Sequence, residues 1–192
     1  MNKFNNFVKK TFFFLIRNIT SSIQKTNNKR IILVQESFSG SNTFSMYKLL
    51  SDKFKSDKEV ILYKDQESKN LIDYIKKIYF LASAKIIITT HASYKLKKSQ
   101  IHFQMWHAMM IKKGGTMLLN SDEKFSVPKD WKRDDYILSY SETYTTFLNS
   151  MMTTDPRKYK ILGAPRNDFL FKKDDYQKLN KLINIESFKN KI

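Results

Sequence analysis

Short runs of β-branched and aromatic residues alternate with helical stretches along most of this chain, and this alternation restricts its fold more than any other feature. The predicted strands are 31–35, 60–63, 86–90, 101–106, 136–139 and 160–162, and the predicted helices are 43–54, 70–82, 142–151 and 174–190. Strands that alternate with helices are typical of a parallel sheet covered on both faces. We therefore predict an α/β fold with a Rossmann-like parallel sheet flanked by helices.

The first segment, residues 1–28, has a different pattern. Apolar residues recur there at intervals of three and four, which predicts a helix with one apolar face. Its longest apolar run, 12–16, is far shorter than the ~20 residues that span a bilayer, and no small-residue cleavage site follows it as in a signal peptide. We predict an amphipathic helix at an anionic membrane surface. Packing of this helix on its own domain is the alternative. The predicted membrane-binding residues are Lys9, Lys10, Phe12, Phe13 and Arg17.

Positive charge is concentrated in two parts of the chain. Lys and Arg number 35 against 18 Asp and Glu, and the formal net charge is +17. Residues 1–35 and 74–121 contain no acidic residue and supply 15 of these 17 charges. Because 30 of the 35 cations are Lys, which acts as a point charge and lacks the fork of Arg, anionic lipid or phosphate fits better than a nucleic-acid partner. The alternative is a lysine-rich composition spread over solvated faces.

Several classes of chemistry are excluded or unsupported. The chain has no Cys, so disulfides, thiol nucleophiles and Cys-ligated metals are excluded. Its three His residues lack the spacing of known metal motifs, and its four Gly cannot form a glycine-rich phosphate loop. The adjacent acids at 134–135 and 174–175 also lack an Asp-x-Asp metal spacing, and solvated charge is the default for both pairs. We expect neither a metal nor a cofactor.

Polar residues that could carry chemistry follow the predicted strands. Ligands of open parallel sheets bind beyond the carboxyl ends of the strands. The residues at these positions are Glu36, His91, His107, Arg166 and Asp168. We interpret both His91 and His102 as structural, as strand-end or partly buried side chains. Trp106 is interpreted as core packing.

Three segments together resemble one family. Residues 104–114 read Gln-Met-Trp-His-Ala-Met-Met-Ile-Lys-Lys-Gly, residues 36–42 read Glu-Ser-Phe-Ser-Gly-Ser-Asn, and residues 163–168 read Gly-Ala-Pro-Arg-Asn-Asp. In this order they resemble the CDP-glycerol glycerophosphotransferases, the primases and polymerases of teichoic acid. The resemblance runs from about residue 31 to 171. Ala108 replaces the commoner Gly, and Met109-Met110 replace the more frequent Thr-Pro.

The resemblance implies the N-terminal domain of a transferase with a fold like glycosyltransferase B (GT-B), at residues 29–171. Residues 172–192 would be a C-terminal helix or the start of a crossover to a second, nucleotide-binding domain, which a second polypeptide could also supply. Such enzymes move glycerol phosphate from CDP-glycerol, or ribitol phosphate from CDP-ribitol, to a polyprenyl-linked acceptor. They are peripheral proteins at the cytoplasmic face of the plasma membrane. We expect the present chain alone to release little CMP.

The resemblance also implies roles for individual residues. His107 would be the base that takes a proton from the acceptor hydroxyl, since imidazole titrates near neutrality. Lys112 and Lys113 would neutralise phosphate charge as CMP leaves. Arg166 would contact a phosphate or pair with Asp168.

The sequence leaves two alternative functions open. One is a sugar-transferring relative, because the fold alone does not determine the donor. The other is a non-catalytic remnant that binds membranes or nucleic acid through its basic surfaces.

Overall fold

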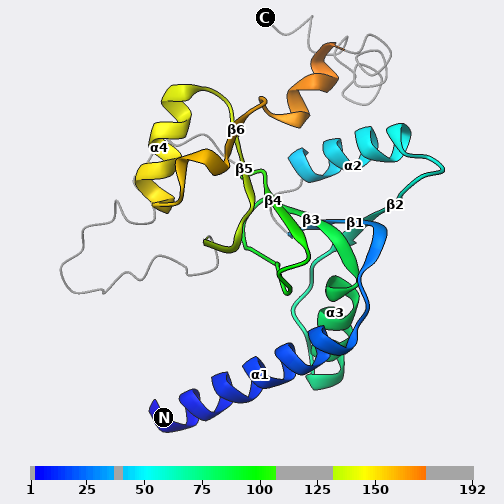
Figure 1. Ribbon diagram of the computed structural model, residues 1–192, viewed down its shortest axis with the longest axis vertical. Coiled ribbons are helices and arrows are strands. Elements are labelled where there is room, and N and C mark those ends of the chain that lie inside the picture. The colour runs from blue at the N-terminus through cyan, green and yellow to red at the C-terminus, as the bar shows by residue number, and fades with distance from the viewer. Residues whose placement is uncertain (1–2, 37–40, 107–131, 172–192) are drawn as a thin grey trace, which may run out of the picture.

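The computed structural model describes residues 3–36, 41–106 and 132–171 (Figure 1). In chain order the elements are α1 (Lys3–Ile23), β1 (Asn27–Gln35), α2 (Ser41–Lys53), β2 (Glu59–Lys64), α3 (Leu71–Ala82), β3 (Ala84–Thr89), β4 (Ile101–Gln104), β5 (Tyr136–Ser139), α4 (Glu142–Met152), the 3-10 helix η3 (Pro156–Lys158), β6 (Tyr159–Ile161) and the 3-10 helix η4 (Pro165–Phe171). The predicted helix at 174–190 lies outside the described residues.

The six strands form one parallel sheet in the order β2-β1-β3-β4-β5-β6. The predicted α/β architecture and all six strand positions are thus confirmed. Strand β4 is the one whose length was overestimated, because it ends at Gln104 and not at Trp106. The next residues leave the extended conformation, and Trp106 has a φ of 55°.

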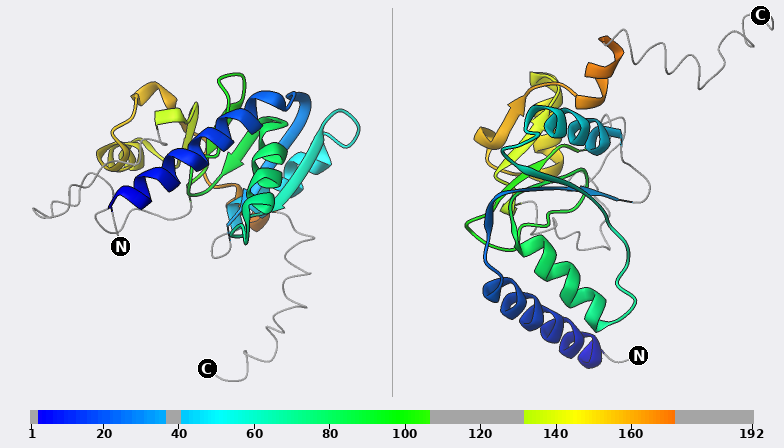
Figure 2. Two further views of the ribbon diagram at one scale, coloured as in Figure 1. Left: turned by 90° about the horizontal axis from the view of Figure 1, so that it is seen from below. Right: turned by 90° about the vertical axis from the view of Figure 1, so that its right-hand side faces the viewer.

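Strand β1 contributes to the core on both faces of the sheet because its apolar run is continuous. Residues 31–34 are all buried, as expected for a strand that helices cover on both faces. Since side chains alternate along a strand, Ile31 and Leu33 pack with residues of α2, whereas Ile32 and Val34 pack with Leu81 of α3. Figure 2 shows the result: α2 lies on one side of the sheet, and α3 and α1 lie on the other. Helix α4 packs on Ile137, which pairs with Gln104 of β4 and therefore lies on the face that α3 covers.

Local capping fixes where two of these helices begin. The side chain of Asn70 accepts a hydrogen bond from the backbone N–H of Asp73 at the start of α3, and Ser141 accepts one from Tyr144 at the start of α4. Each cap satisfies an N–H that a helix leaves without an internal partner. The helix α4 ends at Thr153, which has a left-handed conformation (φ 46°, ψ 51°).

Helix α1 is attached to the domain at a few points along its length. Phe13 makes an edge-to-face contact with Tyr74 of α3, with ring centroids 5.0 Å apart. Arg17 donates a hydrogen bond to the carbonyl of Lys95 at 3.2 Å, and Lys97 donates one to the carbonyl of Gln24. No helix among the described residues is both long and apolar enough to cross a membrane.

Candidate active site

The three segments that carry the family resemblance meet at the carboxyl edge of the sheet, on the side chain of Asn42. This residue is the second of α2 and is only 1% exposed. Its amide nitrogen donates to the carbonyl of Trp106 at 3.2 Å and to the hydroxyl of Tyr140 at 3.3 Å. Its amide oxygen accepts from the backbone N–H of Arg166 at 3.4 Å. One buried amide therefore connects the turn after β1, the end of β4, the end of β5 and the segment after β6.

The turn at Trp106, the residue before His107, is held by a second buried amide. Gln104 has no exposed surface; its side-chain oxygen accepts from the N–H of Trp106 at 3.2 Å, and its nitrogen donates to the carbonyl of His91 at 2.8 Å. The positive φ of Trp106 costs roughly 1–2 kcal/mol for a residue with a Cβ. Strain of this kind persists where surrounding contacts enforce it, and it is concentrated at functional sites.

A network of charged side chains continues along the same edge. Nδ1 of His91, which follows β3, lies 3.0 Å from Oε2 of Glu36, which follows β1. The other oxygen of Glu36 accepts from the N–H of Ala92 at 3.2 Å. A carboxylate in contact with one ring nitrogen orients the imidazole, as in many catalytic histidines. His91, interpreted from the sequence as structural, is therefore also a candidate to exchange protons.

Tyr94 joins this network to the end of β2. Its hydroxyl donates to Asp65 at 2.5 Å and lies 3.5 Å from Glu36, while Lys77 pairs with the same Asp65. Burial, and next the hydrogen bond to Asp65, raise the pKa of Tyr94 far above its ordinary value. Tyr94 is therefore a permanent hydrogen-bond donor at neutral pH.

The structure accounts for only some of the residues predicted from the sequence. Arg166 and Asp168 lie in η4 at this edge, Arg166 partly buried and Asp168 exposed. The guanidinium of Arg166 is close enough to Tyr144 to lower its pKa, although burial and Tyr140 raise that pKa by more. His107, Lys112 and Lys113 lie outside the described residues, so their roles stay predictions.

The predicted membrane-binding residues all fall in α1, but they have different surroundings. Phe12 is 49% exposed, whereas Phe13 and Arg17 contact the domain as described above. The side chains of Lys9 and Lys10 lie outside the described part of the structure.

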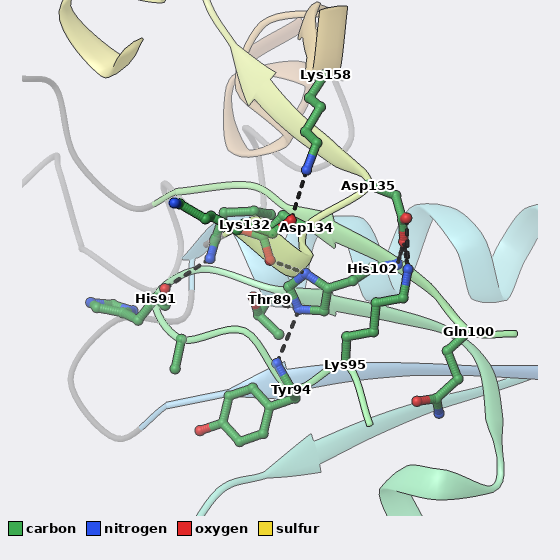
Figure 3. A network of polar contacts seen from close by, with 12 residues as sticks. Thr89, His91, Tyr94, Lys95, Gln100, His102, Lys132, Asp134, Asp135 and Lys158 are labelled. Carbon is green, nitrogen blue, oxygen red and sulfur yellow. Dashed lines mark hydrogen bonds and ion pairs between the residues drawn. The ribbon is translucent and has the colours of Figure 1, made fainter. Parts of the chain in front are cut away.

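The default reading of residues 134–135 as solvated charge was wrong for Asp134. This carboxylate is fully buried, and its Oδ1 lies 2.8 Å from Nδ1 of His102, which is equally buried (Figure 3). The other ring nitrogen of His102 contacts the Thr89 hydroxyl at 3.3 Å. The structural interpretation of His102 fits this position, because a sealed imidazole does not meet a substrate. A buried carboxylate is tolerated here because an imidazole faces it directly.

No group of three or more potential metal ligands occurs among the described residues. The carboxyl edge instead offers imidazole, hydroxyl, amide and guanidinium groups, which suit proton transfer and the binding of phosphate oxygens. The sheet and these groups define a class: a Rossmann-like α/β domain whose carboxyl edge is suited to phosphate chemistry.

The chain belongs to the CDP-Glycerol:Poly(glycerophosphate) glycerophosphotransferase family, which residues 17–192 match. No curated protein gives a significant sequence match. Among solved structures the chain is similar to the wall teichoic acid polymerase TagF, with a TM-score of 0.68 and 15% identity over 97% of this chain and 53% of that one. It is also similar to TagF with a histidine replaced by asparagine, after a soak with CDPG (TM-score 0.67, 16% identity, 97% and 55% covered). The chain spans about half the length of these structures, and at such identities the similarity shows the fold.

Proposed function

We propose that this chain is the acceptor-side half of an enzyme that transfers glycerol phosphate from CDP-glycerol to a hydroxyl of a polyprenyl-linked acceptor. The observation that carries the proposal is the convergence of the three family segments on Asn42. The parallel sheet brings these segments, 60 residues apart or more, to its carboxyl edge, which is where open α/β sheets bind their ligands. Ribitol phosphate from CDP-ribitol is the corresponding reaction of relatives with another donor.

The transfer needs a base because the acceptor hydroxyl is protonated. An alcohol is a poor nucleophile until a base takes its proton, and we assign that role to His107, worth typically 10²–10⁴ in rate. The acceptor oxygen then bonds to the glycerol-bearing phosphorus, the bond from that phosphorus to the bridging oxygen breaks, and CMP leaves with the electron pair. The negative charge that develops on the phosphate oxygens would be stabilised by the cationic side chains of Lys112, Lys113 and Arg166.

The test is CMP release from CDP-glycerol by this chain together with a nucleotide-binding domain of the family. We expect activity in that pair and little in the chain alone. His107→Ala should lower the rate by about 10²-fold or more, and His91→Asn serves as the comparison, because Glu36 orients that imidazole at the same edge. Full activity in His107→Ala together with loss in His91→Asn would transfer the role of base to His91. UDP release from a UDP-sugar in place of CMP release would favour the sugar-transferring alternative.

We also propose that the protein is peripheral at the cytoplasmic face of the plasma membrane. Helix α1 presents an apolar stripe to solvent, formed by residues that are between 49% and 73% exposed: Val8, Phe12, Leu15, Ile19 and Ile23. A surface helix ordinarily turns its polar side to water. The reversed arrangement fits a helix whose outer face enters a lipid interface.

Liposome flotation tests this second proposal. Deleting residues 1–25, or the milder change Ile19→Ser with Ile23→Ser, should abolish or strongly reduce flotation with anionic vesicles. The matched control is Phe44→Ser with Phe147→Ser, two exposed aromatic residues on α2 and α4. If the chain ignores vesicles but binds DNA with a steep dependence on salt, the membrane proposal is wrong and nucleic acid is the partner.

A further inference from the structure

A pocket of about 530 Å³ lies at the amino edge of the sheet, away from the carboxyl edge that carries the candidate active site. One wall is α1, with Phe14, Arg17 and Asn18. The other walls are the segment before β4, the segment before β5, and Lys158 before β6. Its volume is in the range of small-ligand sites.

Positive charge dominates the lining of this pocket. Seven cationic side chains face two carboxylates there: Arg17, Lys95, Lys97, Lys98, Lys132, Arg133 and Lys158 against Asp134 and Asp135. Both carboxylates are engaged within the protein, Asp134 with His102 and Asp135 with Lys95 at 2.7 Å (Figure 3). Arg17, Lys97 and Lys158 also donate to backbone carbonyls, which are neutral, so the lining keeps its net positive charge. Like charges gathered around a concave surface raise its potential and attract an anion.

The lysine-bearing loop is fixed in place before any ligand binds. Gln100 is buried, and its side-chain oxygen accepts from the N–H groups of Leu96 and Lys97 at 2.9 and 3.1 Å. Its nitrogen donates to two carbonyls, those of Leu81 at 2.8 Å and Ala84 at 2.9 Å. The polar side chain of Gln100 thus has four hydrogen bonds, and the loop that it holds spends little further entropy on binding.

The opposite face of α1 indicates what kind of anion would bind. The helix that lines the pocket with Arg17 turns its apolar stripe outward, so one element joins a cationic pocket to a lipid-facing surface. Lysines act as compact point charges and suit a phosphate group. A phospholipid supplies both a phosphate for the pocket and acyl chains for the interface.

We propose that this pocket binds the phosphate of an anionic phospholipid headgroup, one lipid per chain. The proposal rests on the membrane association described above. It adds a saturable lipid-binding site, whereas a diffuse basic surface would attract lipids without saturating at a fixed number. The pocket would hold the domain in a defined orientation on the membrane.

The experiment measures binding of dihexanoyl phosphatidylglycerol, kept below its micelle concentration, to the full chain by calorimetry. The test variant is K98Q/K132Q, which removes two exposed lysines of the pocket, and the matched control is K58Q/K69Q, which removes the same charge elsewhere. We expect saturation at one lipid per chain, affinity about 30-fold weaker in the test variant, and a change within about threefold in the control. Equal unfolding midpoints for the variants show that folding is intact.

Each other result overturns the proposal in a distinguishable way. Equal weakening in both double variants would mean diffuse attraction without a site. Flotation of the chain with vesicles but no binding of the short-chain lipid would reject the pocket and leave the membrane association standing. A soluble oligo(glycerol phosphate) that binds more tightly than the lipid, and loses its binding in K98Q/K132Q alone, would assign the pocket to the polymer and not to a lipid.

Discussion

Replacing Asn42 by alanine is the sharpest perturbation that the structure offers. The side chain is buried and makes three hydrogen bonds, to Trp106, Tyr140 and Arg166. Alanine fits the start of a helix, so the backbone of α2 should tolerate the change. What is lost is the connection among three segments that lie far apart in the sequence.

The expected loss of unfolding free energy follows from the three hydrogen bonds that Asn42→Ala removes. At 3.2 to 3.4 Å the three bonds are longer than the usual N–H···O distance. We therefore assign each about 1 kcal/mol, the middle of the range for a net hydrogen bond, and about 3 kcal/mol in total. For a chain of 192 residues, this corresponds to a fall in Tm of about 6–12 °C. Asn42→Asp should cost at least as much, because it aims an oxygen at the carbonyl of Trp106.

The assay is urea unfolding followed by circular dichroism, together with the fluorescence of Trp106 in a Trp131→Phe background. The control is Asn28→Ala, an exposed asparagine of β1. We expect a loss of about 3 kcal/mol and a shifted emission for Asn42→Ala, and neither effect for the control. A loss below 1 kcal/mol with unchanged emission would refute the view that this amide holds the site together.

Three further predictions concern other parts of the structure. Asp134→Ala leaves the buried His102 without its carboxylate and should lower the free energy of unfolding by about 3 kcal/mol or more, measured by urea unfolding at pH 7. Because the pKa of Tyr94 is raised, the stabilising effect of this tyrosine is complete below pH 10 and falls as the pH rises further. Tyr94→Phe should therefore reduce the loss of unfolding free energy between pH 10 and 11.5. An unchanged dependence of stability on pH would contradict this. Thr153 ends α4 in a left-handed conformation, so Thr153→Gly should raise the free energy of unfolding by about 1 kcal/mol, while Thr153→Ala should not.

The fold was predictable from strands with continuous hydrophobic runs, of which β1 is the clearest. Residues 31–34 are apolar without interruption, and such a run has few uses other than a strand buried on both faces. The end of β4 was not predictable in this way. Met105 and Trp106 continue the apolar pattern in sequence, yet the amide of Gln104 bonds the N–H of Trp106 and turns the chain away from the sheet.

The candidate site was predictable in position but not in detail. The rule that ligands bind beyond the carboxyl ends of parallel strands placed Glu36, His91 and Arg166 at this edge, although His91 was interpreted as structural. The central role of Asn42 carried no signal of its own, since a polar residue at the start of a helix is ordinarily solvated or caps the helix. Asp134 was misread for a related reason: adjacent acids usually lie on the surface, and the only hint of burial was that its partner His102 falls within an apolar strand.

Polar residues in the segment that contains β4 hold the neighbouring loops in place at both edges of the sheet. Gln100, His102 and Gln104 alternate along it and are all buried. Gln100 holds the lysine loop at the amino edge, His102 faces Asp134 in the middle, and Gln104 holds the turn of Trp106 at the carboxyl edge. Three apolar residues would bury as much surface at lower cost in desolvation, so stability alone does not explain them. A shift of the strand by one residue would break all three sets of contacts at once and place Phe103 among polar partners. The buried amides and the imidazole thus specify the register of β4, and through it the relative positions of the pocket and the candidate active site.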